Sequence, residues 1–192
     1  MSLMQITDLT KKFGKKTLFE GFSLTVPENG IIAINGESGK GKTTLFRIIA
    51  GLDKKYSGTL DFGSIKKIAY VFQEPRLLPM STSLENVALP LGNTPEAKEK
   101  AKEYLTKVGL ENDINTYPDE LSGGMKMRVA IARALAYDGD LLLLDEAFNG
   151  IDKDTAQSIM DIIKEYAKDR PVLVITHIKE HLDYLGCKCI EL

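Results

Sequence analysis

The glycine-rich stretch from residue 36 to residue 43 constrains the fold of this chain more than any other feature. It reads GESGKGKT and matches G-x-x-x-x-G-K-[ST] in full, between an apolar run at Ile31–Ile34 and a helical pattern at Thr43–Ala50. In this strand–loop–helix context, glycines let successive N–H groups point at phosphate oxygens, and the helix N-terminus adds partial positive charge. We therefore predict a phosphate-binding loop in which Lys42 contacts the β- and γ-phosphates and Thr43 holds Mg²⁺. The alternative is a glycine-rich turn that binds nothing, and the complete match in this context argues against it.

Short apolar runs alternate with helical patterns along the rest of the chain. Three further runs of this kind are Ile68–Phe72, Leu141–Leu144 and Val172–Ile175. Runs of this length suit strands buried on both faces of a parallel sheet. Residues 152–168 carry apolar side chains at helical spacing, and Asp152 or Asp154 is suited to cap that helix. The alternation predicts an α/β domain.

The first thirty residues and the middle of the chain have different patterns. Met4–Leu9 and Phe22–Val26 favour strands, and Pro27–Gly30 is a turn signal, so we expect a small antiparallel sheet. Pro95–Val108 is helical, with Gly109 as a stop. A chain of 192 residues supports one full core. We predict a single domain over residues 1–192, with a helical subdomain inserted at about residues 76–136.

Composition excludes several classes of protein. The net charge of −2 gives no electrostatic footprint for nucleic acid, and the lysines at 11, 12, 15 and 16 are interpreted as a solvated loop. The N-terminus lacks the apolar core of a signal peptide, and the apolar runs fall short of the about 20 residues of a membrane span. Cys187 and Cys189 alternate along an expected terminal strand and do not bridge. These features predict a soluble protein in a reducing, cytosolic compartment.

A pair of carboxylates follows one of the predicted buried strands. Asp145 and Glu146 come directly after the run Leu141–Leu144. Ligands bind at the carboxyl edge of open α/β sheets, so these side chains are expected beside the phosphate loop. Asp145 is then suited to hold Mg²⁺, and Glu146 is suited to accept a proton from an attacking water. A helix-capping pair at a strand exit is the alternative.

A second glycine-rich segment narrows the family. Leu121-Ser122-Gly123-Gly124-Met125 and the helical run that follows it to Leu135 resemble the signature and signature helix of ABC ATPases. Ser122 and two glycines at a helix N-terminus form a second anion site. The resemblance covers nearly the whole chain and implies a P-loop NTPase fold of the ABC-ATPase type. It also implies a head-to-tail dimer, in which Ser122, Gly123 and Gly124 of one subunit complete the ATP site of the other.

The remaining family motifs occur in the family order. Gln73 resembles the Q-loop glutamine that contacts Mg²⁺, Asn149–Asp152 resembles the D-loop, and His177 resembles the switch histidine. By resemblance, Glu146, His177, Gln73 and Lys42 are catalytic, and Thr43, Gln73 and Asp145 bind Mg²⁺. The residues implied to bind ATP within the same chain are Phe13, Gly36, Glu37, Ser38, Gly39, Lys40, Gly41, Lys42, Thr43 and Thr44.

Each of these motif residues also has a plainer interpretation. Gln73 and His177 would also suit ordinary strand ends, and Phe13 would suit a core or edge aromatic as well as stacking on adenine. Three positions depart from the family pattern: Met125 stands where glutamine is commonest, Ala147 replaces the usual proline, and the D-loop lacks its usual form. None of the departures removes a catalytic group.

The segment from Gln73 to Val87 is similar to that of nitrate/sulfonate/taurine-type importer ATPases. This implies ATP hydrolysis that drives solute transport, with a membrane permease docked near residues 73–87, and a location at the inner face of the cell membrane. Pro75 and Pro79 stiffen an apolar loop suited to docking, although such a loop would also pack on its own subdomain.

Three further hypotheses remain at this point. A non-transport ABC ATPase, for example of the iron–sulfur assembly type, fits the chain length, and a degenerate module would lack hydrolysis. A zinc site is the third hypothesis, suggested by the spacing of His177, His181, Cys187 and Cys189. That spacing matches no standard zinc-finger pattern.

Overall fold

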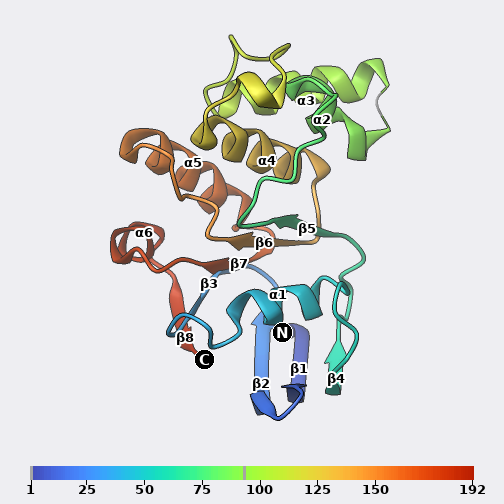
Figure 1. Cartoon of the computed structure of the whole chain (residues 1–192), viewed down its shortest axis with the longest axis vertical. Helices are drawn as coiled ribbons and strands as arrows, with labels where there is room; N and C mark the ends of the chain where they lie inside the picture. The colour runs from blue at the N-terminus through green and yellow to red at the C-terminus, as the bar shows by residue number, and fades with distance from the viewer. Residues whose placement is uncertain (1, 93) are drawn as a thin grey trace.

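The computed structural model of the chain describes residues 2–92 and 94–192. Met1, and residue 93 inside the expected helical subdomain, lie outside the described part. Within these described residues the chain forms two sheets, shown with the helices in Figure 1. A three-stranded antiparallel sheet has the order β2-β1-β4, and a five-stranded sheet has the order β5-β6-β7-β3-β8. Every strand pair recorded in the larger sheet is parallel.

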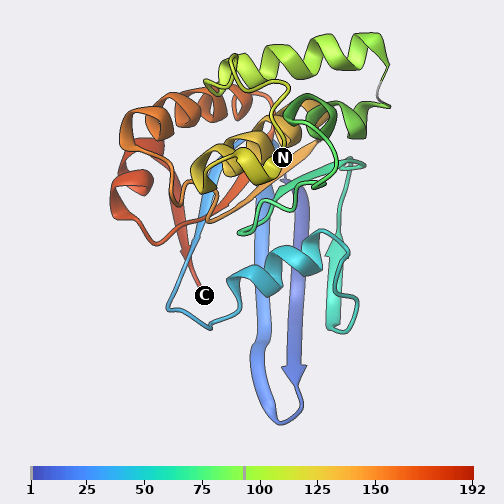
Figure 2. The same ribbon diagram turned by 45° about the horizontal axis from the view of Figure 1, so that its top comes forward.

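The antiparallel sheet comes mainly from one long hairpin. Strands β1 (Ser2–Phe13) and β2 (Lys16–Pro27) pair with each other, and β4 (Ser57–Asp61) pairs with the other edge of β1. In Figures 1 and 2 the β1–β2 hairpin projects from the rest of the chain, with its turn at the far end. The expected N-terminal strands are present and are longer than predicted, because each continues into the paired hairpin arms.

Four parallel strands match the predicted apolar runs closely: β3 (Gly30–Asn35), β5 (Ile68–Val71), β6 (Leu141–Asp145) and β7 (Pro171–Ile175). The expected terminal strand is β8 (Lys188–Glu191). All five residues of β6 and of β7 are buried, as expected for strands covered on both faces. The α/β class with a mostly parallel sheet is therefore confirmed.

Helices cover the two faces of the parallel sheet. Helix α1 (Lys42–Ile49) packs on one face. Helices α4 (Gly123–Tyr137) and α5 (Lys153–Tyr166) pack on the other face. Buried side chains form two clusters, one containing residues of α1 and the antiparallel sheet, the other containing residues of α3, α4 and α5. Alternate residues of β6 belong to different clusters, because successive strand side chains point to opposite faces.

The middle of the chain is helical. Beyond the parallel sheet, α4 packs with α2 (Ser83–Ala88) and α3 (Pro95–Lys107). Two short 3₁₀ turns, η1 (Leu89–Leu91) and η2 (Pro118–Glu120), connect these helices. Helix α5 begins after Asp152, whose side chain accepts a hydrogen bond from the Thr155 N–H, so Asp152 is the cap among the two predicted candidates.

Two expectations from the sequence need correction. Lys11 is only 2% exposed, because its ammonium pairs with Asp53 and donates to the carbonyl of Lys55. It is therefore not part of a solvated loop. Cys187 precedes β8, and Cys189 lies within it, so the two thiols do not alternate along one strand; both are free. The short helix α6 (Lys179–Leu185) carries His181.

Candidate functional site

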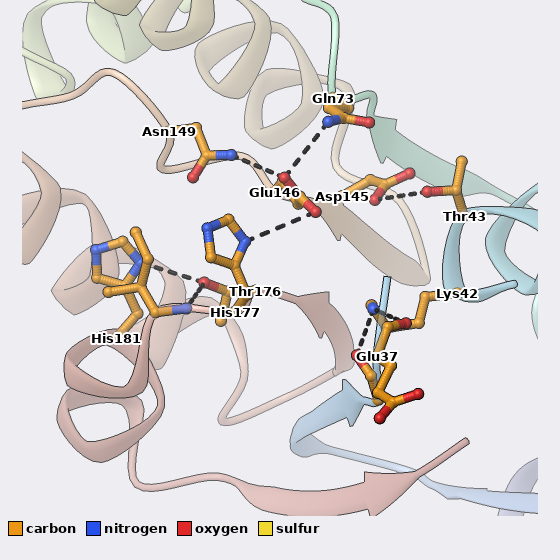
Figure 3. Close-up of polar contacts among 12 residues, drawn as sticks. Glu37, Lys42, Thr43, Gln73, Asp145, Glu146, Asn149, Thr176, His177 and His181 are labelled. Carbon is orange, nitrogen blue, oxygen red and sulfur yellow. Dashed lines mark hydrogen bonds and ion pairs between the residues drawn. The ribbon is translucent and has the colours of Figure 1, made fainter. Parts of the chain in front are cut away.

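Four loops meet at the carboxyl edge of the parallel sheet. The phosphate loop follows β3, Gln73 follows β5, Asp145 ends β6, and His177 follows β7. Because the strands are parallel and adjacent, their carboxyl ends lie at the same edge. Figure 3 shows Lys42, Asp145, Glu146 and His177 gathered there.

The phosphate loop depends on glycines for its shape. Gly36, Gly39 and Gly41 all have φ between 80° and 141°, a region that L side chains rarely adopt. A Cβ atom on Gly41 would lie 2.6 Å from the side chain of Leu18, so β2 packs directly against the loop. This packing brings the β1–β2 hairpin beside the loop.

Lys42 reaches across the phosphate loop. Its ammonium donates hydrogen bonds to the carbonyls of Gly36, at 2.6 Å, and Glu37, at 3.1 Å. Lys42 begins α1, so the charge lies at the positive end of that helix. An ammonium and a helix N-terminus together favour a polyphosphate anion at this point.

Asp145 is a buried carboxylate with a partner on each oxygen. The hydroxyl of Thr43 donates to Oδ1 at 3.2 Å, and the hydroxyl of Tyr70 donates to Oδ2 at 3.1 Å. Burial raises the pKa of Asp145, and the two hydrogen bonds oppose that rise. Burial and the charge of Asp145 raise the pKa of Tyr70, so its hydroxyl stays a proton donor.

Glu146 occupies a strained turn directly after β6. Its φ of 51° lies in the left-handed region, which costs a non-glycine residue about 1–3 kcal/mol. Its N–H donates to the carbonyl of Ile175 at 2.9 Å, and this bond ties the turn to β7. The Glu146 carboxylate lies beside Gln73, after β5, and His177, after β7. Backbone strain of this kind clusters at functional sites.

Three side chains surround the Glu146 carboxylate (Figure 3). Asn149 donates to Oε2 at 2.8 Å, and Gln73 donates to the same oxygen at 3.4 Å. Nδ1 of His177 lies 3.8 Å from Oε1. The two donors on Oε2 orient the carboxylate, and Oε1, which receives from the described residues no hydrogen bond shorter than the His177 contact, is left able to accept a proton from a nearby water.

His181 has a different environment from His177. Its ring packs edge-on against Phe148, with centroids 5.3 Å apart, and burial lowers its pKa. Its Nδ1 lies 3.4 Å from the hydroxyl of Thr176. Among the described residues, no three or more His, Cys, Asp or Glu side chains are grouped in a way that could hold a metal ion.

The glycines at the start of α4 have separate environments. A Cβ atom on Gly124 would lie 2.4 Å from the carbonyl oxygen of Gly150, whereas one on Gly123 would meet nothing within 4 Å. Gly124 therefore lets the start of α4 pack on the segment that carries Asn149. Ser122 is exposed, and its hydroxyl accepts a hydrogen bond from the Met125 N–H, which caps the helix.

The structure brings some predicted residues together and separates others. Gln73, Asp145, Glu146 and His177 share one edge of the sheet with the phosphate loop. Residues 122–124 begin α4, which belongs to the core on the face opposite α1. Phe13 lies at the end of the hairpin, 54% exposed, with the Lys11 ammonium 4.6 Å from its ring centroid.

Sequence reasoning missed two contributors to this site. Tyr70 is part of an apolar strand pattern that suggests only core packing, although a tyrosine there needs a partner for its hydroxyl. Lys11 lies in a lysine-rich stretch that suggests solvent exposure. In both cases the partner is more than 40 residues away in the sequence.

Comparison with known proteins identifies the family. The model of the ABC transporter family matches residues 19–149. This chain belongs to the ABC transporter family. As an ATP-binding protein of that family, it binds ATP and is an ATPase.

Several curated members of the ABC transporter family are similar over most of the chain. An aliphatic sulfonates import ATP-binding protein of Mesorhizobium japonicum is 41% identical over 177 residues, which cover 91% of this chain and 71% of the relative. A protein of the same description from Pseudomonas syringae pv. syringae is 40% identical over 193 residues, covering 98% of this chain and 69% of the relative. A third, from Corynebacterium glutamicum, is 39% identical over 178 residues, which cover 90% of this chain and 72% of the relative.

Solved ABC cassettes share the fold. A dimeric ATP-binding cassette in a post-hydrolysis state with ADP and Pi has a TM-score of 0.88 and 31% sequence identity, covering 98% of this chain and 94% of that chain. A second dimeric structure, described as a bacterial ABC transporter cassette, gives the same values. Within the described residues, no helix is both long enough and apolar enough to cross a membrane.

Proposed function

We propose that this ABC ATPase drives solute import by hydrolysing ATP between two copies of the chain arranged head to tail. The observation that carries the proposal is the arrangement around Glu146, whose carboxylate faces Gln73, Asn149 and His177 beside Asp145. These groups surround the position where a γ-phosphate held by the phosphate loop would meet water. The reaction they suit is hydrolysis of the terminal phosphate.

We assign the steps of hydrolysis to residues of this chain. Lys42 exchanges its bonds to the loop carbonyls for bonds to the β- and γ-phosphates. Glu146 accepts the proton of the attacking water, while Gln73 and His177 orient the water and the γ-phosphate. The exposed ring of Phe13 offers a face on which adenine can stack.

Mg²⁺ fits the pair formed by Thr43 and Asp145. A hydroxyl and a carboxylate oxygen 3.2 Å apart are hard oxygen donors of the kind that Mg²⁺ prefers. When bound, the ion would supply positive charge that neutralises the charge developing on the phosphate group during hydrolysis. Gln73 would approach it from the loop after β5.

The second subunit is proposed from the placement of residues 122–124. They lie at the start of α4. The buried residues of α4 belong to the hydrophobic cluster on one face of the sheet, and those of α1 belong to the cluster on the other face. A serine and two glycines at the start of a 15-residue helix form an anion site that the chain's own phosphate loop does not use. A head-to-tail partner would bring this site onto the γ-phosphate.

Docking to a permease is proposed at residues 73–87. Met80 is 87% exposed and Leu78 is 44% exposed, in a loop that follows Gln73. Arg133 of α4 donates to the carbonyls of Pro75 and Arg76 and so braces this loop. Purification of the native protein should recover an integral membrane subunit; recovery of a soluble partner instead would contradict the docking.

We propose that the permease recognises the transported solute. This chain carries the nucleotide site and would not contact the solute. Relatives described as aliphatic sulfonates import proteins make an aliphatic sulfonate the proposed solute. Uptake of a labelled alkanesulfonate should be lost in cells that lack this chain and restored by its return.

The base assignment is tested by Glu146→Gln. The amide keeps the shape of the side chain but cannot accept the proton, so kcat for ATP hydrolysis should fall by about 10²–10⁴. ATP should still bind, and an ATP-dependent dimer should accumulate in analytical ultracentrifugation. Glu165→Gln, on the exposed surface of α5, is the control for the same chemical change. Unchanged turnover in Glu146→Gln would rule out Glu146 as the base.

A further inference from the structure

Tyr70 makes a contact with the metal-site carboxylate that no motif explains. Its hydroxyl donates to Oδ2 of Asp145 at 3.1 Å, while the hydroxyl of Thr43 donates to Oδ1 at 3.2 Å. Asp145 is 1% exposed, so solvent does not compete for either oxygen. With one donor on each oxygen, the plane of the carboxylate is fixed, and Oδ1 is directed toward Thr43.

The ring of Tyr70 is held by packing on two sides. It meets Phe46 of α1 edge-on, with centroids 6.1 Å apart and planes at 78°. It stacks on Phe72, with centroids 3.9 Å apart. Tyr70 and Phe72 are two residues apart along an extended segment, which puts both side chains on one face.

The packing continues toward the loop after Gln73. The guanidinium of Arg76 lies 4.1 Å from the centroid of the Phe72 ring. The backbone of Arg76 accepts a hydrogen bond from Arg133 of α4. The Tyr70 ring is therefore packed between the helix that follows the phosphate loop and the segment that leads to Gln73, and these contacts oppose its rotation away from Asp145.

Partners of this kind affect metal sites in a known way. A carboxylate that binds a metal through one oxygen is oriented by a hydrogen bond on the other, and loss of that bond lowers metal affinity by about 10–100-fold. A tyrosine that merely fills the core would lower stability when changed, but it would not alter metal affinity selectively. The two roles are thus separable by experiment.

We propose that Tyr70 is a positioning residue that holds Asp145 with Oδ1 directed toward the Mg²⁺ site beside Thr43. The inference rests on the proposed function, because it needs Asp145 as a metal-binding carboxylate. The role belongs to the hydroxyl, since the ring alone would pack equally well as phenylalanine.

The test uses Tyr70→Phe, which removes only the hydroxyl. Mn²⁺ serves as the probe, titrated by electron paramagnetic resonance in the presence of a non-hydrolysable ATP analogue, so that no turnover is required. The apparent Mn²⁺ affinity should fall by about tenfold. Affinity for the analogue in EDTA should change by less than about twofold, because a carboxylate-directed hydroxyl acts through the metal.

A matched control is available where α6 meets α5. Tyr184 donates to both oxygens of Asp161, at 3.0 and 2.9 Å, on the exposed surface. Tyr184→Phe thus removes a tyrosine–aspartate hydrogen bond without touching the nucleotide site, and its Mn²⁺ affinity should match that of the unaltered chain. Melting temperatures establish that each variant is folded under the conditions of the titration.

Asp145→Asn separates the two ways in which the test can fail. If Asp145→Asn loses Mn²⁺ affinity and Tyr70→Phe does not, the positioning role of Tyr70 is wrong while the metal site stands. If Asp145→Asn also leaves Mn²⁺ affinity unchanged, the metal assignment in the proposed function is itself wrong. Equal losses of Mn²⁺ affinity and of analogue affinity in EDTA for Tyr70→Phe would indicate a purely structural tyrosine.

Discussion

At the scale of single residues, Lys11 has the least expected environment in the chain. Its ammonium lies 2.7 Å from Oδ2 of Asp53 and donates to the carbonyl of Lys55 at 2.8 Å. Both partners come from the segment after α1, so the pair joins β1 to the end of the helix that follows the phosphate loop. The same ammonium approaches the ring of Phe13, whose position it therefore helps to fix.

Lys11→Met should reduce the free energy of unfolding by about 2 kcal/mol at pH 7, because Met keeps the apolar stem but leaves Asp53 without its cation. The hydrogen bond from Lys11 lowers the pKa of Asp53. A group whose folded pKa is depressed stabilises the protein above its unfolded pKa, and that contribution is lost as pH falls through the folded value. The difference between the two proteins should therefore shrink below about pH 4.

Urea denaturation at pH 7 and at pH 3 measures this difference. Lys107→Met is the control, since the pair of Lys107 with Glu103 is exposed and its removal should change stability little. A destabilisation by Lys11→Met that stayed constant with pH would show that lost packing, and not the ion pair, is responsible.

At the scale of elements, Asn86 determines the shape of the proposed docking loop. Asn86 lies in α2, is fully buried, and accepts a hydrogen bond from the N–H of Leu78 at 2.7 Å. Its amide nitrogen donates to the carbonyls of Leu78, Ser81 and Thr82. One side chain thus satisfies the backbone of a turn that has no regular structure, and it fixes where Met80 projects.

Asn86→Ala should lower the free energy of unfolding by about 3 kcal/mol, because buried backbone groups lose their partners. The amide of Leu78 should also exchange its hydrogen faster, since its acceptor is gone. Hydrogen exchange followed by mass spectrometry or NMR reads this directly. Asn112→Ala, at an exposed position, should alter neither quantity. Unaltered exchange at Leu78 would mean that the turn is held by other contacts.

At the scale of the whole molecule, the parallel sheet joins two cores into one cooperative unit. Leu142 belongs to the cluster with α4 and α5, and the adjacent Leu143 belongs to the cluster with α1 and the antiparallel sheet. Both are fully buried. Strand β6 contributes side chains to both clusters. Unfolding of either cluster would therefore remove packing contacts from the other.

Leu142→Ala and Leu143→Ala should each lower the free energy of unfolding by about 2–5 kcal/mol, although they open cavities on opposite faces. Both variants should still unfold in a single transition, with far-ultraviolet circular dichroism and tyrosine signals coinciding. Leu89→Ala, at a residue 51% exposed, should stay within about 0.5 kcal/mol of the unaltered chain. Separate transitions for the two probes would contradict a single cooperative unit.

The α/β class, the parallel strands and the phosphate loop could all be predicted from the amino-acid sequence alone. These features are local: apolar runs, helix caps such as Asp152 and the glycines at 36, 39 and 41 act on their own neighbourhood of the chain. The resemblance to ABC ATPases added the family, which the comparisons confirm. Residue roles at the site and the subdomain boundary at about residues 76–136 remain predictions.

Which side chains meet across long separations in the sequence depends on the folded arrangement of the elements. The hydroxyl of Tyr70 reaches Asp145, the ammonium of Lys11 reaches Asp53, and Gly124 packs on Gly150. No periodicity or spacing encodes these contacts, because each depends on how two elements lie in space once the sheet has assembled. The signals they leave in the sequence are a tyrosine in an apolar strand, a lysine at a buried position and a glycine at the start of a helix, and each is ambiguous until its partner is known.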